Sequence, residues 1–397
     1  MPEPVIYHID VNSAFLSWEA AFRLRMDPSS EDLRKVPSII AGDPKSRHGI
    51  VLASSIPAKK MGVVTAEPIA SALKKCPDAL LIAPNYHLYA ENSRLLMEHL
   101  RKYAPTVDQF SIDEAFCDMT GTELLYGNLI DFAYKLKNEI YQSYGFTVNI
   151  GISTNYLLAK MASDFEKPNK VHTLFPDEIQ EKMWPLPVEN LLFVGKSTAA
   201  SLHRLGIHTI KDLATSSPQL LSSHLKKQGQ TAWQYANGIC DDTHFTREAT
   251  NKGYSHSTTL SKDCTDPALA KEILLSLCET VGARLREDKM KISVVSVTIK
   301  NTDFESHSKQ TSLYSHTDVT DEIYTTACKL FDSLYDGSPI RLLCVSTSKA
   351  TDDSNYQYDL FHSEQHEKLE KLDSAIDEVR SKFGQDSIQR ATFLKKK

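Results

Sequence analysis

The order of apolar and polar positions divides the first part of the chain into alternating strands and helices. Residues 5–11 are apolar and rich in strand-forming side chains, and residues 14–24 follow with the spacing of a helix. The same pattern predicts strands at 38–41, 50–54, 79–82, 106–112, 114–119 and 147–153, and helices at 57–61, 69–75, 86–103, 124–144 and 156–165. This order is typical of an α+β sheet domain into which residues 22–85 are inserted.

The pattern changes after residue 170. Short helical stretches predict an all-helical domain, a polar run at 243–256 predicts a linker, and the remainder predicts a second α+β domain from residue 257. The short helices are expected at 176–183, 198–205, 210–214, 219–225 and 232–236. In the last domain we expect helices at 268–286, 321–334 and 364–383, and strands at 291–300, 308–313 and 340–348. The fold class is therefore predicted to be α+β and multidomain.

The composition agrees with several folded domains. The 397 residues correspond to roughly two to four domains. A content of 41% apolar and 24% charged residues is typical of soluble globular proteins. The formal net charge of −6 argues against a protein that coats nucleic acid through overall positive charge. Binding to DNA would instead need a local basic face or bound cations.

The chain shows no signal for a membrane or an export route. It has no stretch of about 18 apolar residues, and its first residues contain no basic leader or signal-peptide core. The seven cysteines are scattered and form no Cys-x-x-Cys pair, which favours reduced thiols. We expect a cytoplasmic monomer without a membrane partner.

Three acidic residues are the first candidates for chemistry. Asp10 ends an apolar strand, and Asp113 and Glu114 are neighbours inside the apolar stretch 110–116. Neighbours in a strand point to opposite faces, so a pair near a hairpin tip can hold one site from two sides. Three carboxylates can bind two Mg²⁺ ions, which would align a 3′-hydroxyl with an α-phosphate and neutralise a pyrophosphate leaving group. Acids at strand ends are also common in solvated turns, so these residues alone leave both interpretations open.

Longer motifs surround these acids and continue along the chain. They are His8-Ile-Asp-Val-Asn-Ser-Ala-Phe15, Ser111-Ile-Asp-Glu-Ala-Phe116 with Asp118-Met-Thr-Gly121, Gly151-Ile-Ser-Thr-Asn155, Lys160-Met-Ala-Ser-Asp-Phe-Glu-Lys-Pro-Asn169 and Ile376-Asp-Glu-Val-Arg-Ser-Lys-Phe-Gly384. Together they resemble the signatures of the Y-family translesion DNA polymerases, the DinB/UmuC group. The matches occur in the family's order and extend over nearly the whole chain.

The resemblance implies a right-handed polymerase with palm, fingers, helical thumb and an α+β little finger. The palm would comprise residues 1–21 and 86–170, the fingers 22–85, the helix-hairpin-helix thumb 171–242, the linker 243–256 and the little finger 257–397. The implied activity is template-directed, error-prone DNA synthesis during lesion bypass. A dNTP would be joined to the 3′-hydroxyl of primer-template DNA with two Mg²⁺ ions, and no segment resembles a proofreading exonuclease.

The same resemblance implies roles for single residues. Asp10, Asp113 and Glu114 would be the catalytic and metal-binding acids, and the Val11 carbonyl would complete the metal shell. Phe15 falls at the steric gate, where an aromatic ring excludes a ribose 2′-hydroxyl. The nucleotide-binding positions would be Ala14, Phe15, Lys59 and Lys167, with Lys167 on the incoming triphosphate. Outside the resemblance, Phe15 could be a core residue and Lys167 a surface lysine.

Three positions depart from the family's pattern. Asn12 stands where the first motif has a second acid, and an amide carries no charge. In the stretch 54–59, Ile56 takes the place of a tyrosine that usually touches the triphosphate, and Lys59 takes the place of an arginine. Lysine keeps the positive charge but loses the forked hydrogen bonding of arginine. These departures bear on nucleotide affinity more than on the chemistry.

The predicted thumb contains a stretch that resembles a helix-hairpin-helix. Val194-Gly-Lys-Ser-Thr-Ala-Ala-Ser-Leu202 would present backbone N–H groups and a helix N-terminus to a DNA phosphate at Gly195 and Lys196. Phe193 takes the place of the usual first hairpin glycine, so the turn is expected to differ from the family's.

Two further surfaces are predicted in the last domain. Basic residues in or beside its strands could line either a phosphate-facing sheet or a solvated face, namely Lys289, Lys291, Lys300, Lys309, Arg341 and Lys349. Gln357-Tyr-Asp-Leu-Phe361 resembles a bacterial sliding-clamp-binding peptide, in which Gln357, Leu360 and Phe361 would contact the clamp. The alternative is that Leu360 and Phe361 pack in their own domain. The preceding polar run at 351–356 favours the clamp.

The leading hypothesis is an error-prone, Mg²⁺-dependent DNA polymerase for lesion bypass. One alternative is a catalytically weakened regulator that binds DNA and the clamp, with Asn12, Ile56 and Lys59 as its symptoms. The presence of all three acids argues against it. A second alternative is another palm-like enzyme, such as a nucleotidyl cyclase, and the thumb-like and little-finger-like segments argue against that one.

Overall fold

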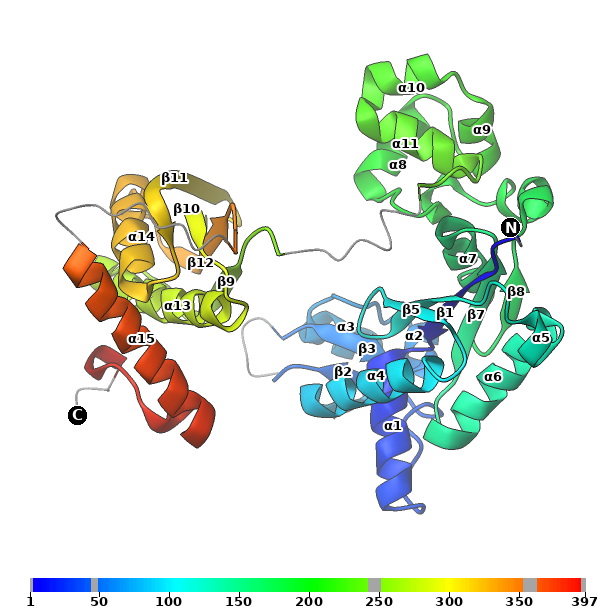
Figure 1. The fold of residues 1–397 in the computed structure, drawn as a ribbon, viewed down its shortest axis with the longest axis horizontal. Helices are drawn as coiled ribbons and strands as arrows, with labels where there is room; N and C mark the ends of the chain where they lie inside the picture. Colours follow the sequence, from blue (N-terminus) through cyan, green and yellow to red (C-terminus); the bar gives the residue numbers. More distant parts are fainter. Residues whose placement is uncertain (1–2, 44–48, 242–250, 353–362, 394–397) are drawn as a thin grey trace. The chain divides into compact units, whose positions relative to one another are not determined.

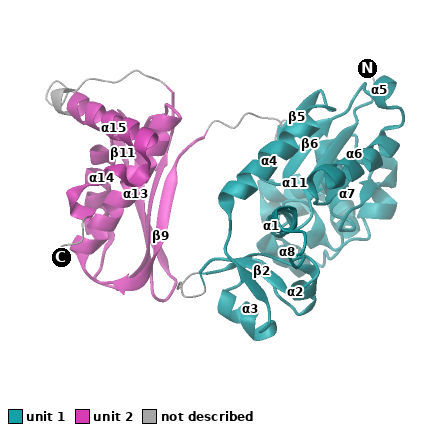
Figure 2. Ribbon diagram, turned by 90° about the horizontal axis from the view of Figure 1, so that it is seen from below, with its two compact units in different colours: residues 1–247 teal, residues 248–397 magenta. Residues whose placement is uncertain are grey.

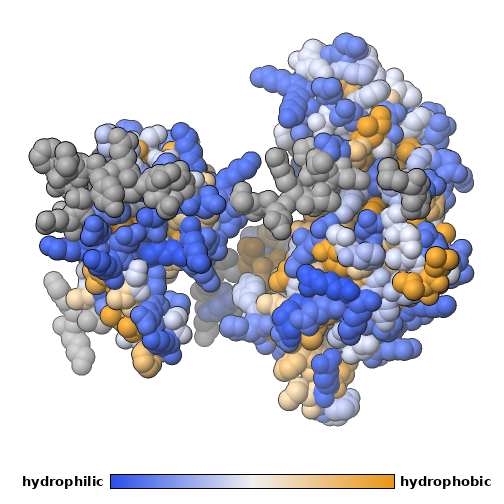
Figure 3. Space-filling view, viewed as in Figure 1, coloured by the Kyte–Doolittle hydropathy of each residue, from blue (hydrophilic) through white to orange (hydrophobic). Residues whose placement is uncertain are grey.

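The computed structural model describes residues 3–43, 49–241, 251–352 and 363–393 (Figure 1). The chain divides into two compact units, residues 1–247 and 248–397, which are coloured separately in Figure 2. Each unit has its own hydrophobic core. The face in Figure 3 is largely hydrophilic, with apolar residues in small separate groups. None of the described helices combines the length and apolar composition that crossing a membrane requires.

A five-stranded sheet forms the base of the first unit. Its order is β5-β6-β1-β7-β8, and neighbouring strands are antiparallel except β7 and β8. The strands are β1 (Ile6–Val11), β5 (Thr106–Gln109), β6 (Glu114–Asp118), β7 (Val148–Ser153) and β8 (Val171–Thr173). β1 is buried along its whole length and lies in the middle of the sheet.

The alternation of side chains along β1 sends them to two different layers. Tyr7, Ile9 and Val11 join the large core, whereas Ile6 packs against a helix on the opposite face. Asp10 shares the face of Ile6, so that helix lies over the acid. The helices around the sheet are α1 (Ala14–Met26), α4 (Tyr86–Leu100) and α6 (Leu129–Tyr144) in the large core, and α7 (Tyr156–Ser163) on the other face.

The insertion between α1 and α4 has a small sheet of its own. Its order is β3-β2-β4, with β2 antiparallel to β3 and parallel to β4. The elements are β2 (Ser38–Ala41), β3 (Val51–Ser54), α2 (Ile56–Lys60), α3 (Ile69–Lys75) and β4 (Leu80–Ile82). Ile39, Val51 and Ile69 belong to a separate small core. The insertion is therefore a subdomain whose edge faces the end of β1.

Short helices follow the first sheet. They are η1 (Pro176–Glu178), η2 (Ile179–Met183), η3 (Val188–Asn190), α8 (Lys196–Arg204), α9 (Ile210–Thr215), α10 (Pro218–Leu225) and α11 (Lys227–Ala236). Their core also contains Leu158 and Met161 of α7. Asn155 Nδ2, at the start of α7, donates to Gly238 O at 3.1 Å. Helix α7 is thus shared between the sheet and the helical layer.

The second unit is a four-stranded antiparallel sheet covered by helices on one face. Its order is β11-β10-β12-β9. Helices α13 and α14 pack on the sheet, and α15 packs on these two helices (Figure 2). The elements are β9 (Ser255–Cys264), α13 (Pro267–Glu287), β10 (Ile292–Asn301), β11 (Ser306–Thr317), α14 (Thr320–Leu334), β12 (Ile340–Ser348), α15 (Ser363–Phe383), η4 (Gln385–Ser387) and η5 (Ala391–Phe393).

Three local predictions were wrong. The helix predicted at 124–144 is two helices, α5 (Glu123–Tyr126) and α6, because the chain turns at Gly127 with a φ of 74°. Strand β8 was not predicted, and its pairing with β7 places it in the first sheet rather than in the helical domain. Strand β9 was also missed, and it begins at Ser255, inside the predicted linker. Eight of its ten side chains are polar and only Leu260 and Cys264 are buried, so it lacks an apolar signal.

Candidate active site

Two acids face each other at one end of the first sheet. Asp10 on β1 lies opposite Glu114 on β6 in the antiparallel register, and directly opposed residues point to the same face. Asp10 is only 8% exposed. Two like charges in such positions destabilise a sheet unless an opposite charge is supplied nearby. A cation is therefore needed beside Asp10 and Glu114 to offset the repulsion between the two carboxylates.

The third acid, Asp113, lies in the turn before β6. Ser111 Oγ donates to Asp113 Oδ1 at 2.8 Å, and the backbone N–H groups of Phe110 and Ser111 donate to the Glu114 carbonyl at 3.0 and 3.2 Å. The Val11 N–H donates to the Asp113 carbonyl at 3.1 Å. These bonds fix the turn against the end of β1, so all three predicted acids lie at one end of the sheet.

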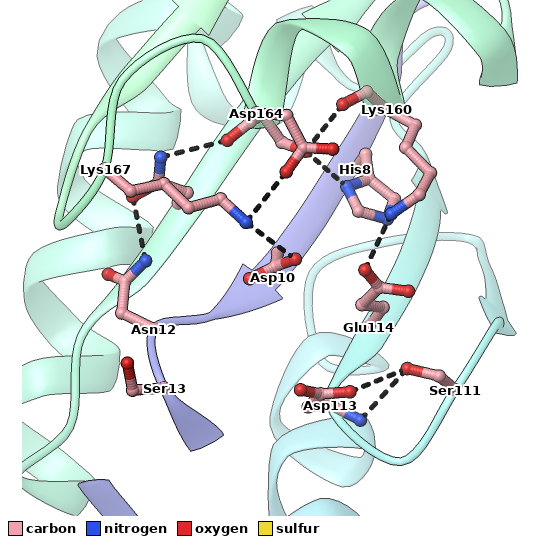
Figure 4. A network of polar contacts seen from close by, with 12 residues as sticks. His8, Asp10, Asn12, Ser13, Ser111, Asp113, Glu114, Lys160, Asp164 and Lys167 are labelled. Carbon is pink, nitrogen blue, oxygen red and sulfur yellow. Dashed lines mark hydrogen bonds and ion pairs between the residues drawn. The ribbon is translucent and has the colours of Figure 1, made fainter. Parts of the chain in front are cut away.

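Two lysines neutralise the opposed acids (Figure 4). Lys167 Nζ lies 3.1 Å from Asp10 Oδ2 and 2.8 Å from Asp164 Oδ1. Lys160 Nζ lies 2.6 Å from Glu114 Oε1, and its side chain is 9% exposed. Each acid of the opposed pair therefore has its own lysine: Lys160 on α7 pairs with Glu114, and Lys167 on the loop after α7 pairs with Asp10.

The Asp10 carboxylate depends on a nearby positive charge. Burial raises the pKa of Asp10 to about 7, while Lys167 opposes the rise and Glu114 adds to it. Burial lowers the pKa of Lys167, but the carboxylates of Asp10 and Asp164 outweigh burial and leave that pKa raised. A buried carboxylate of this kind stays ionised only while a cation remains close.

A cleft of about 610 Å³ opens beside the acids. It brings together residues of the sheet, of α1 and of the inserted subdomain. Most of the predicted site residues line it, namely Asp10, Val11, Ala14, Phe15, Lys59, Asp113 and Lys167. Glu114 reaches the same acid cluster through its register with Asp10. The structure thus gathers in one place residues that are up to about 160 positions apart in the sequence.

The Phe15 ring is fixed by other aromatic side chains. It stacks on Tyr89 with centroids 4.5 Å apart and an interplanar angle of 9°. Tyr86 meets it edge-on at 6.4 Å, and Trp18 lies 6.1 Å away. Phe15 also lines the cleft. A ring held in this way presents a rigid wall to whatever occupies the cleft.

The two departures on the inserted subdomain differ in their consequences. Lys59 Nζ donates to Ser13 Oγ at 3.1 Å, and burial, followed by repulsion from Lys167, lowers its pKa. Its charge therefore points into the cleft, as the family's arginine would. Ile56 also lines the cleft and is 46% exposed. Its side chain offers no hydrogen bond, so a tyrosine hydroxyl is lost without replacement.

The third departure, Asn12, has a structural role. Its Nδ2 donates to Asn149 Oδ1 at 3.1 Å. Its Oδ1 accepts from Thr147 Oγ1 at 2.9 Å and from the Asn169 N–H at 2.8 Å. An aspartate could not donate to Asn149. The amide therefore fixes the loop that carries Lys167.

Two site residues were missed by the sequence analysis. Lys160 was quoted within a motif but was given no role, and Asp164 was not singled out. The available signal was a lysine inside the apolar helix Tyr156–Ser163, whose residues are all buried. A buried lysine needs a partner, and the register of β1 and β6 decides which acid provides it.

The acids are suited to a hard cation, although they do not form a closed cage. In the described part of the chain, no group of three or more His, Cys, Asp or Glu side chains is placed to hold a metal ion. The donor set consists only of carboxylate oxygens and a backbone carbonyl, which are the ligands that Mg²⁺ prefers. The buried Asp10 also requires a positive charge. The residues present therefore fit a divalent metal, and in its absence Lys167 supplies the positive charge beside Asp10.

The predicted DNA hairpin lies at the start of α8. Gly195 is the N-cap residue without a side-chain cap bond, and the first turn contains no acid, so its N–H groups suit a phosphate. Lys196 beside it is exposed. Phe193 has a φ of 65°, the conformation usual for glycine. The phenylalanine adopts this left-handed backbone at a cost of roughly 1–2 kcal/mol, and a turn that differs from the family's stays a prediction.

The basic residues predicted in the second unit do not share one face. Lys291 pairs with Glu370 at 3.1 Å, and the Arg341 guanidinium lies over the Phe304 ring at 4.5 Å. Lys309 lies opposite Val297 of β10 and shares its face. Val297 is three positions from Lys300 on the same strand, so Lys300 and Lys309 point to opposite faces of the sheet. The predicted clamp-binding residues Gln357, Leu360 and Phe361 lie outside the described residues.

Three family models match the chain in sequence order. They are the impB/mucB/samB family over residues 9–164, the IMS family HHH motif over residues 176–207 and the impB/mucB/samB family C-terminal domain over residues 251–360. DNA polymerase IV of Clostridium acetobutylicum is 43% identical over 393 residues, which cover 99% of this chain and 98% of that protein. DNA polymerase IV 2 of Bacillus subtilis is 34% identical, with 99% of this chain and 95% of that protein covered.

The fold has a solved counterpart. A Y-family DNA polymerase chimera superposes with a TM-score of 0.75 at 21% identity, over 88% of this chain and 100% of that chain. At this identity the likeness concerns the fold, and the sequence relatives establish the family. The chain therefore belongs to the DinB-like group of the bacterial Y-family DNA polymerases.

Proposed function

We propose that this DNA polymerase carries out error-prone, template-directed synthesis past lesions, by transfer of a nucleotide from dNTP to a primer 3′-hydroxyl without proofreading. The observation that supports the catalytic part most directly is the opposed pair Asp10 and Glu114 at the end of a cleft. Asp113, Phe15 and Lys167 line the same cleft. A site of this kind works by positioning and electrostatics.

Asp10, Asp113, Glu114 and the Val11 carbonyl would hold two Mg²⁺ ions. When bound, the ions supply activation of the 3′-hydroxyl and neutralisation of the pyrophosphate. Lys167 would then leave Asp10 for the triphosphate. Its side chain is 36% exposed and already has a second partner in Asp164, so the move leaves no buried charge unpaired.

The triphosphate would lie against the start of α1. Ser13, the N-cap residue, makes no side-chain cap bond, and the first turn contains no acid. The N–H groups of Ala14 and Phe15 can therefore bind phosphate oxygens, with Lys59 on the facing subdomain adding charge. The Phe15 ring would exclude a 2′-hydroxyl from the sugar site.

The remaining assignments follow the same proposal. The first sheet would be the palm, residues 22–85 the fingers, the short helices the thumb and the second unit the little finger. Gly195 and Lys196 would bind a phosphate of primer-template DNA. The protein would act as a cytoplasmic monomer.

Primer extension tests the proposed function directly. With Mg²⁺ present, the chain should add dNTPs to a primer on an undamaged template and continue past an abasic site or a bulky adduct. It should misincorporate readily and leave a mismatched 3′-end uncut. Each dNTP is supplied singly to read the template dependence. If extension stops at every lesion while undamaged templates are copied, the bypass part of the proposal is wrong.

The clamp motif leads to a separate prediction. Replacing Leu360 and Phe361 by Ala should weaken binding to the bacterial sliding clamp by roughly 10-fold or more, because such apolar anchors carry most of the energy in peptide recognition. Binding is measured by surface plasmon resonance on immobilised clamp. Extension without the clamp should be unchanged, which serves as the control. Unaltered clamp affinity would refute the motif.

A further inference from the structure

We propose that Lys160 is a positioning residue for Glu114, a buried cation that holds this carboxylate in one orientation for metal binding. The inference rests on the proposed function, since it takes Glu114 to be a metal ligand. It goes beyond that function because it assigns a separate task to a residue that would touch neither the metal nor the nucleotide.

The contact between the two side chains is close and shielded. Lys160 Nζ lies 2.6 Å from Glu114 Oε1, and the two side chains are 9% and 18% exposed. The ammonium group also lies 5.5 Å from the centre of the Phe110 ring, which favours a cation at this place. Among the described residues, Glu114 is the only acid that pairs with Lys160. The lysine thus has one partner, and leaving it would strand a buried charge.

The backbone of Lys160 is equally restricted. Helix α7 packs against both β1 and β7, and every residue of the helix is buried. Gly151 on β7 allows this approach, since a Cβ there would lie 2.0 Å from the Ala159 carbonyl oxygen. The backbone of the lysine is therefore anchored to β1, which carries Asp10, and to its neighbour β7.

The comparison with Lys167 shows why the two lysines have different tasks. Lys167 lies on a loop, is 36% exposed and contacts both Asp10 and Asp164. It can give up Asp10 when a metal arrives. Lys160 has no second acid within the described part of the chain and remains with Glu114. One acid of the opposed pair is therefore covered by an exchangeable cation and the other by a permanent one.

A permanent cation beside a metal ligand has two opposite effects. Its charge repels a divalent ion, so it weakens the equilibrium binding of metal. It also fixes the rotamer of Glu114, so it favours the geometry needed for reaction. Removing it should strengthen metal binding and slow the reaction. A residue that only supports the fold would weaken both.

The test compares Lys160→Met, Lys160→Arg and wild type, with Lys182→Met as the matched control. Lys182 also pairs with a glutamate, Glu178, but outside the cleft. Mn²⁺ binding to the DNA-free proteins is measured by electron paramagnetic resonance. Turnover is measured by single-turnover primer extension at saturating metal and dNTP. Thermal denaturation reports on folding.

Lys160→Met should bind Mn²⁺ roughly 3- to 10-fold more tightly and lower the extension rate roughly 10- to 100-fold. Lys160→Arg should recover most of the rate, and Lys182→Met should match wild type in both measurements. An unchanged rate in Lys160→Met, or weaker Mn²⁺ binding together with a lower melting temperature, would overturn the proposal. A wild-type protein that binds Mn²⁺ but extends no primer would refute the proposed function instead. The Mn²⁺ comparison would still decide the role of Lys160.

Discussion

Replacing Asp113 by Ala is expected to lower the rate of primer extension roughly 10³-fold or more, since one of three metal-binding carboxylates is lost. Binding of primer-template DNA should be unchanged, because Asp113 lies in the cleft and not at the hairpin of α8. Single-turnover extension gives the rate, and fluorescence anisotropy with labelled DNA gives the affinity.

The fold should tolerate this change. Asp113 is half-buried in a turn, where its side chain accepts from the Ser111 hydroxyl and its own backbone N–H donates to that hydroxyl. Asp118→Ala is a suitable control, since that acid lies at the other end of β6 and accepts from the Thr120 N–H. It should retain extension. Extension at the wild-type rate in Asp113→Ala would remove this residue from the catalytic set.

Replacing Phe15 by Ala is expected to reduce discrimination between dNTP and rNTP roughly 100-fold. The ring lines the cleft and is fixed by stacking on Tyr89, so its loss opens space for a 2′-hydroxyl. Discrimination of this kind, by exclusion from a rigid pocket, is a difference in kcat/KM between two substrates. The measurement is therefore kcat/KM for dCTP and CTP opposite the same template guanine.

The neighbouring Tyr86→Ala provides the matched control. Tyr86 meets the Phe15 ring edge-on but does not line the cleft, so sugar discrimination should be kept. Incorporation of dNTP by Phe15→Ala should fall much less than discrimination does. Equal discrimination in wild type and Phe15→Ala would show that another residue excludes the ribose.

The sequence could indicate the proposed acids and the proposed gate because their motifs are local. Asp10 and Phe15 occur within eight consecutive residues, and Asp113 and Glu114 are adjacent. What it could not supply is the partner of each charge. The pairing of Lys160 with Glu114 depends on the helix α7 lying over β6, and that is set by tertiary packing. The sequence motif contained Lys160, but it did not show that the side chain points toward Glu114.

The structure adds backbone geometry and contacts to two departures from the family's pattern. Asn12 looked like a lost charge, and it is a hydrogen-bond hub that needs an amide donor. Phe193 stands in the place of a glycine, and its backbone is left-handed. Both outcomes depend on backbone geometry, which residue type alone does not reveal. The regulator alternative loses one of its three supporting residues for this reason.

The missed strands have a simpler explanation. β9 exposes Ser255 and Ser257 on its polar positions and buries few apolar residues, so it has almost no hydrophobic alternation. β8 has only three residues. Each strand forms because a neighbouring strand supplies hydrogen bonds: β7 pairs with β8, and β12 pairs with β9. Pairing of this kind is decided between segments, and a single segment does not encode it.

The position of α7 sets a limit on how this polymerase could be recombined with its relatives. Its eight residues contact two parts of the unit. Lys160 points toward the acids, while Leu158 and Met161 belong to the core of the short helices. A chimera that exchanges the helical domain has no clean junction at this helix. Residues of α7 that face the sheet would have to come from the protein that supplies the sheet. Residues that face the short helices would have to come from the protein that supplies those helices. The two sets alternate along α7, so no single cut in the chain separates them.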